Sequence, residues 1–369
     1  MNYESLRTPY FLVDRGKMQA NCDALLSKAK ELGVSIRPHI KTHKTREGAF
    51  MQHDGGKVGP VTVSTLAEAE FLSDECSDML YGFPITPDKF PAIAELNVSK
   101  DVAVVSDSPD VLRKLSEYLK GLETNVPVYL KVDAGASRAG FHHSRIGDIA
   151  SASRLVEQLP HLSFTGLMTH AHHSYASRSR EESLSYTREE NENLKSLLEG
   201  LNSEGIHPPV ISTGSTPTTM LQTEAGVSTE IRPGNYVFYD RFQSDIGTCD
   251  REQIACFVMA RVSGHYPDRN QLLIDAGALA FSKDQGAKHV RNEVTYGEAY
   301  HFPEIQVQEI SQEHGLAGSN TPIDFEEFPI GSLIRFIPNH SCLTAACFNK
   351  YYIEDEGEII DIWEPAKGW

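Results

Sequence analysis

Short apolar runs alternate with longer amphipathic segments over the first two thirds of the chain. Each run rich in valine, isoleucine and leucine predicts a β-strand, and the segment after most of them has helical periodicity. The predicted strands lie at 35–41, 61–64, 79–83, 102–106, 127–133, 162–170, 210–214 and 228–238. Strand–helix units repeated this often over about 230 residues fit a parallel (β/α)8 barrel, of TIM type, better than an open doubly wound sheet.

The pattern changes after residue 240. Strands broken by turns, with little helical periodicity, are predicted at 254–266, 271–277, 304–315, 332–340, 350–357 and 358–364. The sequence therefore predicts an α/β chain of two domains. Residues 1–240 form the barrel and residues 241–369 form a mostly antiparallel β domain, on which the first ten or so residues can also pack.

Composition and charge exclude several classes of function. The formal net charge is -17 over 369 residues, so there is no excess of lysine and arginine to displace counterions from nucleic acid. Neither a signal peptide nor an 18-residue apolar stretch is present, and we expect no membrane partner. The six cysteines have no CxxC spacing, which favours free thiols and a cytoplasmic location.

A basic octet, RPHIKTHK at 37–44, ends the first predicted strand. In an extended conformation Arg37, His39 and Lys41 share one face. Reactive residues of a (β/α)8 barrel lie at the carboxyl ends of its strands, which places Lys41 at the barrel mouth. Neighbouring cations and a low dielectric lower the pKa of an amine there, as a Schiff-base lysine requires. A solvated lysine at a strand end is the commoner alternative.

Two glycine-containing turns follow later strands of the barrel. The segment STGSTPT at 212–218 predicts backbone N–H groups of Gly214, Ser215 and Thr216 that point outward at a helix start, where a phosphate fits. An ordinary serine or threonine helix cap is the alternative. The segment RPGNY ends the last strand, and its Gly234 allows backbone to approach the same phosphate.

Two further positions carry candidate chemistry. Arg138, just beyond the fifth strand, can pair with an anionic oxygen of a cofactor, or it is simply a surface arginine. In the β domain, His340 and Cys342 stand two residues apart, so in an extended segment they share a side. Imidazole and thiolate suit Zn²⁺, and two protein ligands leave positions open as at a catalytic metal. A buried cysteine beside a capping histidine is the alternative.

Together, RPHIKTHK, KVDAGASRAGF, STGSTPT, RPGNY and PNHSCLTAA resemble, in this order, the fold-type III pyridoxal-phosphate enzymes, which have an alanine racemase-like barrel. The nearest resemblance is to the metal-dependent D-serine dehydratase and D-threonine aldolase group, from residue 8 to residue 364. It implies that Lys41 carries pyridoxal 5′-phosphate through a Schiff base and that Arg138 faces the phenolic oxygen. The phosphate would be held by Gly214, Ser215, Thr216, Gly234 and Asn235.

The resemblance also implies that His340 and Cys342 bind zinc, and that the protein is a homodimer with active sites near the subunit interface. One segment departs from the family pattern, because Thr169 stands where a tyrosine is expected. In the same segment Tyr175 matches a second expected tyrosine, and His170 lies close by. We expect both to contact the cofactor, although a hydrogen-bonded structural histidine is the alternative for His170.

The predicted activity follows from the residue at position 342. Aldolases of the group typically have aspartate where this chain has Cys342, so the resemblance implies a lyase of the D-serine dehydratase type. Such an enzyme eliminates water from a small D-3-hydroxyamino acid and yields a keto acid and ammonia. D-Threonine aldolase-type cleavage and D-threo-3-hydroxyaspartate dehydration are the alternatives. A racemase would not need the metal pair, and the β domain argues against a non-catalytic pyridoxal-phosphate carrier.

Overall fold

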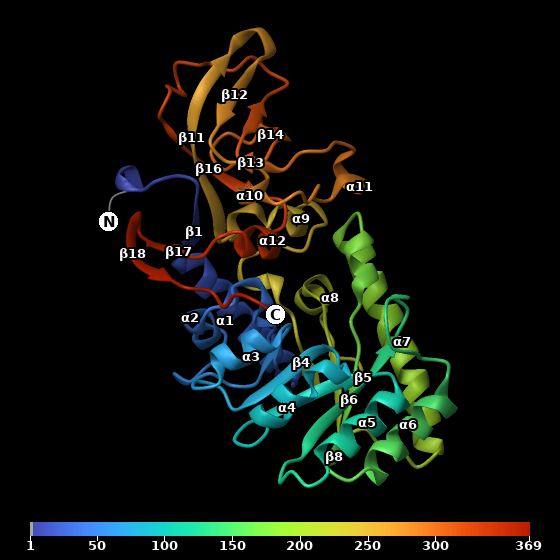
Figure 1. Cartoon of the computed structure of the whole chain (residues 1–369). Helices are drawn as coiled ribbons and strands as arrows, with labels where there is room; N and C mark the ends of the chain where they lie inside the picture. The colour runs from blue at the N-terminus through green and yellow to red at the C-terminus, as the bar shows by residue number, and fades with distance from the viewer. Residues whose placement is uncertain (1–2) are drawn as a thin grey trace. The chain divides into compact units, whose positions relative to one another are not determined.

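The computed structural model describes residues 3–369, which divide into two compact units (Figure 1). The first, called the barrel unit, contains Ala24–Gly234 and Ala366–Trp369. The second, called the β unit, contains Asn235–Pro365 together with the described residues up to Asp23. Each unit is therefore built from two separate stretches of the chain.

The barrel unit contains a closed parallel sheet. Its strands are β2 (Ser35–Ile36), β3 (Val61–Val63), β4 (Asp78–Pro84), β5 (Asp101–Ser106), β6 (Val126–Asp133), β8 (Leu162–Met168), β9 (Val210–Thr213) and β10 (Glu230–Ile231). They pair in the order β2-β10-β9-β8-β6-β5-β4-β3. A bridge between His39 and Thr62, with Thr62 N donating to Pro38 O at 2.9 Å, joins β3 to the chain that follows β2. The predicted (β/α)8 barrel is confirmed.

Helices follow most of these strands, as predicted. They are α2 (Arg46–Met51), α3 (Leu66–Leu72), α4 (Phe90–Leu96), α5 (Pro109–Leu119), α6 (Ile146–Gln158), α7 (Arg180–Ser203) and α8 (Thr216–Leu221), and α1 (Arg15–Leu32) precedes the barrel. Side chains of Thr65, Ser108, Ser179 and Ser215 cap four of the helices, and each accepts the backbone N–H of the residue three positions on. The start of each of these helices is thus fixed by a residue visible in the sequence.

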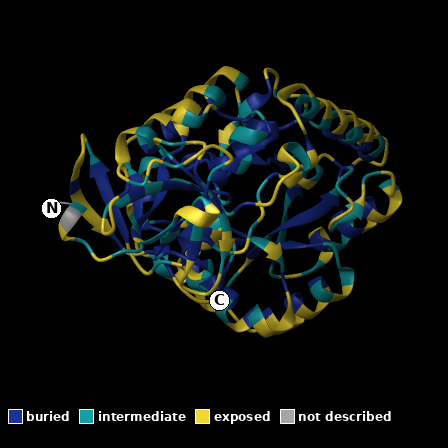
Figure 2. Cartoon of the chain, turned by 90° about the horizontal axis from the view of Figure 1, so that it is seen from above, coloured by how far each residue is buried: buried dark blue, intermediate teal, exposed yellow. Residues whose placement is uncertain are grey.

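The sheet of the barrel unit has apolar side chains on both faces. One large buried cluster lies between the strands and the helices, so the helices are exposed on their outer sides while the strands are buried (Figure 2). A smaller cluster of side chains from β4, β5, β6 and β8 contains Leu80, Ala103, Val105, Tyr129 and Met168. Ser212 of β9 and Glu230 of β10 are buried polar residues instead. One part of the barrel is therefore apolar and the part near β9, β10 and β2 is polar.

The first predicted strand is much shorter than the sequence indicated. Only Ser35–Ile36 pairs as a strand, and Ile40–Thr42 forms a 3-10 turn, η2. His39 N still donates to Pro233 O at 2.9 Å, but neither Pro38 nor Pro233 has an N–H to donate, so strand pairing ends early. Lys41 is therefore in a turn beyond the strand and is not its last residue.

The β unit is built on a second sheet, in the order β12-β15-β14-β13-β16-β11-β1-β17-β18. Its strands are β1 (Tyr10–Asp14), β11 (Cys256–Tyr266), β12 (Gln271–Ile274), β13 (Gly297–Ala299), β14 (Gln306–Ile310), β15 (Gly315–Gly318), β16 (Leu333–Pro338), β17 (Tyr351–Asp355) and β18 (Glu358–Trp363). All pairings are antiparallel except that of β1 with β17. The short helices of this unit are α9 (Arg241–Asp245), α10 (Ala278–Phe281), α11 (Lys288–Arg291) and α12 (Ser341–Ala346).

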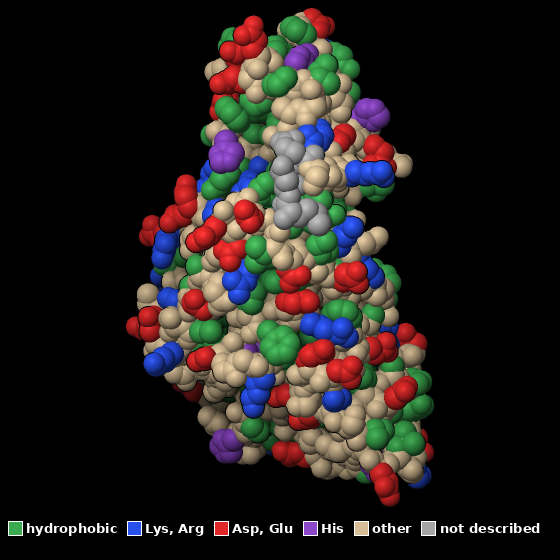
Figure 3. Space-filling view, turned by 90° about the vertical axis from the view of Figure 1, so that its left-hand side faces the viewer, with side chains coloured by type: hydrophobic (Ala, Val, Ile, Leu, Met, Phe, Trp, Pro, Cys, Tyr) green, Lys and Arg blue, Asp and Glu red, His purple; other side chains and the backbone are tan. Residues whose placement is uncertain are grey.

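Charged residues of both signs are mixed on the face of the molecule shown in Figure 3. On the face in Figure 3, acidic and basic side chains are interspersed and no continuous basic area is visible, as expected for a chain of net charge -17. Among residues 3–369, no helix has the length and apolarity needed to span a bilayer.

Candidate active site

The lysine turn that follows β2 is held by hydrogen bonds of its own backbone. His43 N and Lys44 N both donate to Ile40 O, at 3.1 and 2.7 Å. His39 caps the turn, because its Nδ1 accepts the Lys41 N–H at 3.5 Å. Burial lowers the pKa of His39 well below its usual value, and the charge of Lys41 acts in the same direction. The Lys41 amine therefore lies close to the His39 ring.

Three other basic residues of the octet are also engaged. Arg37 donates from Nε to Glu230 at 2.9 Å and forms a second ion pair with Asp78. His43, which is fully buried, contacts Thr45 Oγ1 and Gln52 Oε1 at 3.1 Å each. Lys44 pairs with Glu68 at 3.0 Å. The basic residues Arg37, His43 and Lys44 thus stabilise the turn that carries Lys41.

Cations gather near this turn on other strands. Lys131 on β6 is buried, which lowers its pKa to about 7, and the charges of Arg232 and Arg138 act in the same direction. Arg232, just beyond β10, donates from Nε to Ser212 Oγ at 2.7 Å and from Nη2 to Thr169 O. Its charge also lowers the pKa of His39. This part of the barrel unit is therefore suited to an anion.

One buried acid accompanies these cations. Glu190 on α7 accepts the hydroxyl of Thr169 at 2.5 Å. Burial raises the pKa of Glu190, while the Thr169 hydrogen bond and the charges of Arg232 and Lys131 oppose that rise. The position at which a tyrosine was expected is thus occupied by a small hydroxyl residue paired with a carboxylate.

His170 and Tyr175 lie in the segment after β8. His170 Nδ1 contacts Gly214 O at 2.6 Å, and since a carbonyl only accepts, Nδ1 carries the proton and Nε2 is unprotonated. Burial lowers the pKa of His170 well below its usual value, with the charges of Lys41 and Lys131 acting the same way. The Tyr175 ring lies 6.4 Å from the His170 ring, centroid to centroid. His170 is therefore a neutral imidazole within reach of the charge of Lys41, and Tyr175 lies next to it.

The predicted phosphate turn begins at Gly214, whose φ is +137°. A Cβ added there would lie 2.9 Å from Arg232 N, so only glycine fits. Ser215 caps α8, and its own N–H donates to Thr218 Oγ1 at 3.2 Å in a capping box. That N–H does not point outward, contrary to our expectation. The hydroxyl of Thr219, near Gly214, is buried and has no hydrogen-bond partner among the described residues.

Gly234 has a packing reason to be glycine. An added Cβ would lie 3.1 Å from both Cβ and O of His39 and 3.5 Å from Thr42 Oγ1. The end of the last barrel strand therefore lies directly against the lysine turn. This contact was not evident in the sequence, from which we inferred only an approach to phosphate.

Asn235 belongs to the β unit and contacts the proposed metal pair. Its amide Nδ2 donates to Asp240 Oδ2 at 2.6 Å and to Ser341 Oγ at 2.9 Å, and lies 3.8 Å from Cys342 Sγ. Its Oδ1 is buried and has no hydrogen-bond partner among the described residues. A role of Asn235 in holding phosphate stays a prediction.

His340 and Cys342 are adjacent, but not for the reason predicted. The strand β16 ends at Pro338, and His340 is the N-cap of α12, so Cys342 lies in a helical turn. The two side chains are hydrogen-bonded to each other. His340 Nδ1 contacts Asp284 Oδ2 at 3.0 Å, which leaves Nε2 for the contact with Cys342. The pair therefore presents one ring nitrogen and one sulfur to the same place.

Acidic residues fix the segment around this pair. Asp240, which is buried, accepts the Ser341 N–H at 2.9 Å and the Ser341 hydroxyl at 3.2 Å. The backbone of Asp284 is held from the other side, because Asn339 Nδ2 donates to Asp284 O at 3.0 Å. Among residues 3–369, no cluster of three or more histidine, cysteine and carboxylate ligands is present.

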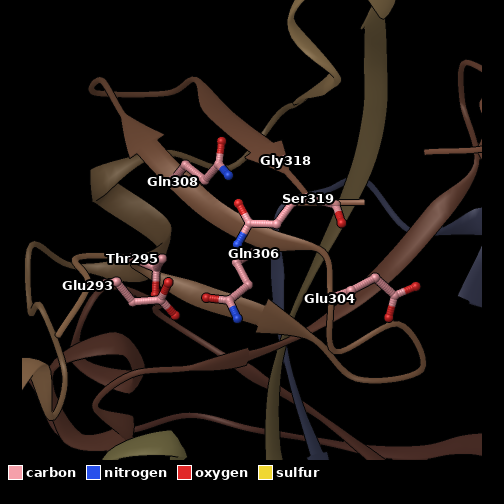
Figure 4. A pocket seen from close by; sticks show the side chains of 8 residues that line it. Glu293, Thr295, Glu304, Gln306, Gln308, Gly318 and Ser319 are labelled. Carbon is pink, nitrogen blue, oxygen red and sulfur yellow. The ribbon is translucent and has the colours of Figure 1, made fainter. Parts of the chain in front are cut away.

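A small cavity of about 50 Å³ in the β unit, shown in Figure 4, is not part of this chemistry. Thr295 and Gln306, which line it, both accept hydrogen bonds from the buried guanidinium of Arg241, at 2.6 and 2.9 Å. Arg241 in turn pairs with Glu298 at 3.4 Å. The cavity therefore lies next to the buried hydrogen bonds and ion pair of Arg241, and its lining residues serve that group.

Sequence reasoning missed Lys131, Arg232, Glu190, Asp240 and Asp284. Lys131 and Arg232 lie inside motifs that we quoted, and both stand in or beside apolar strands, which was the available signal. The three acids gave no such signal, because each is separated by many residues from the group that it contacts.

Comparison with known proteins identifies both halves of the chain. Residues 13–241 match the model of the alanine racemase N-terminal domain, and residues 255–354 match the putative serine dehydratase domain. A D-serine dehydratase of Dictyostelium discoideum is 36% identical, with 99% of this chain and 98% of that protein covered. A D-threonine aldolase of Arthrobacter sp. is 25% identical, covering 98% of this chain and 93% of that one.

A third relative has a solved structure. The D-threo-3-hydroxyaspartate dehydratase of Delftia sp. HT23 is 30% identical over 99% of this chain and 98% of its own. Its structure superposes on that of this chain with a TM-score of 0.92 and 28% identity, and the superposition covers 99% of each chain. The predicted resemblance and the predicted lyase class are confirmed, and the family implies pyridoxal phosphate as the cofactor. The chain belongs to the alanine racemase N-terminal domain family, in the group that joins this domain to a serine dehydratase domain.

Proposed function

We propose that this protein is a D-serine dehydratase that uses pyridoxal phosphate and zinc. It eliminates water from a D-3-hydroxyamino acid and releases a keto acid and ammonia. The observation that carries the proposal is the place of Lys41, in a turn after β2 that His39 caps and from which the charge of Lys41 acts on both His39 and His170. The D-serine dehydratase from Dictyostelium discoideum, matched over nearly the whole chain, supports the choice of reaction.

The barrel unit fits pyridoxal phosphate on three counts. Lys41 supplies an amine for a covalent bond to an aldehyde. The charges of Arg138 and Arg232 both act on Lys131, and such a gathering of cations suits an anionic ligand. The orphan hydroxyl of Thr219 beside Gly214 supplies a donor to a phosphate oxygen. In this arrangement Gly214, Ser215, Thr216 and Gly234 lie at the phosphate end and Arg138 faces the ring oxygen. The Ser215 N–H is used within the capping box, so it is not one of the phosphate donors.

The β unit fits a zinc ion with open coordination positions. His340 and Cys342 provide a nitrogen and a sulfur, the ligand atoms that Zn²⁺ prefers, and Asp284 fixes the ring through Nδ1. A solved variant of a D-threo-3-hydroxyaspartate dehydratase in which a cysteine is replaced by alanine is described as a metal-free form. This supports Cys342 as a metal ligand here.

Each group has a separate task in the proposed reaction. Bound pyridoxal phosphate supplies an electron sink for the electron pair of the broken Cα–H bond, and zinc supplies a Lewis acid for the β-hydroxyl. The ε-amine of Lys41 takes the α-proton of the substrate. His170 stays neutral, because its Nδ1 proton is held by Gly214 O and nearby cations disfavour a second proton. It therefore adds no charge beside the amine of Lys41.

Two other reactions need similar groups. The aldolase alternative breaks a carbon–carbon bond and yields an aldehyde, and the Arthrobacter relative is named as such an enzyme. The D-threo-3-hydroxyaspartate alternative is also an elimination, and it differs only in the substrate side chain. Cys342, in place of the aspartate typical of the aldolases, favours elimination.

The setting of the enzyme is also a proposal. The described cysteines are all free thiols, which suits a reducing cytoplasm. The homodimer follows from the family resemblance, with substrate contacts near the subunit interface. Light scattering of the purified protein would give the mass of the assembly.

The test of the proposed function is a product assay. The holoenzyme is incubated with D-serine, D-threonine and D-threo-3-hydroxyaspartate, and keto acid, ammonia and aldehyde are measured, with Lys41→Ala as the inactive control. We expect pyruvate and ammonia from D-serine at the highest kcat/KM. Glycine and an aldehyde as the main products would instead show an aldolase, and preference for hydroxyaspartate would show the second alternative.

A further inference from the structure

The turn that carries Lys41 ends at Lys44, and Lys44 is anchored from two directions. Its backbone has φ 56°, a left-handed conformation that a non-glycine residue adopts only where its surroundings hold it. Its carbonyl accepts the Ala366 N–H at 2.7 Å, and its ammonium pairs with Glu68 Oε1 at 3.0 Å. Both partners belong to the barrel unit. The end of the lysine turn is thus pinned through backbone and side chain.

Glu68 is more than a helix cap. It is the third residue of α3, where its N–H donates to the Thr65 hydroxyl at 3.2 Å and its Oε2 accepts the Ser64 N–H at 2.6 Å. Its side chain is only 1% exposed, whereas capping carboxylates are commonly at the surface. A buried carboxylate needs a compensating charge, and the described partner is Lys44.

The other side of Lys41 leads to the same helix start. His39 Nδ1 accepts the Lys41 N–H, so the ring proton is on Nε2 and is donated to Ser64 Oγ at 3.3 Å. Ser64 is the residue whose N–H binds Glu68. Lys41 therefore stands between two chains of contacts, one through His39 and one through Lys44, and both end at Glu68.

We propose that Glu68 is a positioning residue that fixes the direction of the Lys41 side chain, with Ala366 as a second anchor of the same turn. The inference rests on the proposed function only in naming Lys41 as the residue that bonds to the cofactor. Glu68 itself touches neither cofactor nor substrate in this scheme. It acts through Lys44 and through the His39–Ser64 contact.

Two ligands separate positioning of Lys41 from general folding. Pyridoxal phosphate has an aldehyde that joins to Lys41, whereas pyridoxamine phosphate has the same ring and phosphate but an amine that cannot. Glu68→Gln keeps an oxygen for the Ser64 N–H and removes the charge opposite Lys44. The apoprotein of each variant is titrated with both ligands, and the dissociation constants are compared with those of the unmodified protein.

In Glu68→Gln we expect pyridoxal phosphate to bind about tenfold more weakly, because a misplacement of roughly 1 Å at a reacting group can cost on the order of 100-fold. Affinity for pyridoxamine phosphate should stay within about twofold, since the groups that hold ring and phosphate are untouched. Equal weakening of both ligands would overturn the proposal, because it would show a loss of structure only. Unchanged affinity for both would overturn it as well.

Glu75→Gln is the matched control. Glu75 follows the same helix and pairs with Arg46 at 3.0 Å, but this pair is more exposed and does not contact His39, Ser64 or Lys44. We expect both affinities to be unchanged in this variant. A selective loss of pyridoxal phosphate affinity in Glu75→Gln would show that any acid near α3 acts in the same way, and would contradict a special role of Glu68.

A second variant tests the turn if Glu68→Gln does not fold. Ala366→Pro removes the N–H that binds Lys44 O and leaves every charge in place, so it should reproduce the selective loss in milder form. Unchanged affinity for pyridoxal phosphate in this variant would contradict the role of Ala366 as an anchor of the turn. If the unmodified protein binds pyridoxal phosphate no better than pyridoxamine phosphate, the covalent role of Lys41 is refuted, and that outcome tests the proposed function instead.

Discussion

The lysine turn of the barrel unit and the His340–Cys342 pair of the β unit hold their reactive groups in different ways. Around Lys41, the residues Arg37, His39, His43 and Lys44 all have partners, and those partners come from several strands and helices. Around Cys342 and His340, two carboxylates do most of the fixing, Asp240 through the backbone and Asp284 through the ring. The first site is therefore held by partners from many elements, and the second mainly by two carboxylates.

The difference suits the kind of bond that we propose for each site. A lysine has a long flexible side chain, so its direction depends on how firmly its backbone is held. A histidine ligand has a rigid ring, and one hydrogen bond to the second nitrogen fixes both its tautomer and its orientation. The lysine turn thus needs many anchors, and each of them contributes a small part.

The largest effect should come from Lys41→Ala, which removes the ε-amine that the lysine turn holds in place. We expect turnover of D-serine to fall by at least about 10⁴-fold, because both the covalent attachment and the base are lost. The near-visible absorbance of the bound cofactor should disappear as well. Retention of the yellow colour together with turnover would refute the role of Lys41.

Cys342→Ala should separate the two sites, because it changes the His340–Cys342 pair and leaves the lysine turn unaltered. Removal of one of the two proposed metal ligands should lower zinc content strongly and reduce elimination by about 100-fold or more. The absorbance of the Lys41-bound cofactor should be unchanged. Chelation of zinc from the unmodified protein is the parallel experiment, and full activity after complete removal of zinc would contradict the Lewis-acid role.

Asp284→Asn should have a smaller effect at the same site. The amide still contacts His340 Nδ1 but no longer favours the protonated nitrogen, so we expect zinc affinity to fall by about 10- to 100-fold. Competition with a chromogenic chelator would measure the change. Asp245→Asn is unsuitable as a control because the Asp245 side chain is buried in its pair with Arg291, whereas Asp355 is far more exposed in its pair with Arg15. Zinc affinity in Asp355→Asn should equal that of the unmodified protein.

The smallest effect concerns acid stability, for which the barrel unit carries buried histidines. Burial lowers the pKa of His43 to about 4, against a usual value of 6.5. Between these values the unfolded chain binds one proton more, so stability is full above pH 6.5 and is lost as pH falls towards 4. The expected slope is about 1.4 kcal/mol for each pH unit. Denaturant unfolding at several pH values should give a flatter profile for His43→Gln.

The barrel was predictable because its signals are local. Each strand is a short apolar run, and Thr65, Ser108, Ser179 and Ser215 mark helix starts by their own side chains. The strands β13 (Gly297–Ala299) and β15 (Gly315–Gly318) were missed, because they are short, contain glycine and lack alternation. Their pairing partners, not their composition, make them strands.

The candidate site was only partly predictable for the same reason. The sequence indicated Lys41 and the His340–Cys342 pair by residue type and spacing, but it gave the wrong local conformation for both. Pro38 ends the first strand, and the short run SCLTAA forms a helix where the strand pattern was extended too far. Glu68 and Asp284 act across long separations in the chain, and no spacing rule could find them.

The close packing of Gly234 against His39 affects which substitutions position 234 can accept. Its missing side chain leaves the room in which Cβ and O of His39 lie, 3.1 Å from where a Cβ would stand. Even alanine would push on the residue that accepts the Lys41 N–H. In a library of random variants selected for growth, position 234 should therefore score as tolerating few substitutions. The cause would be steric, and a catalytic role read from that score would be mistaken.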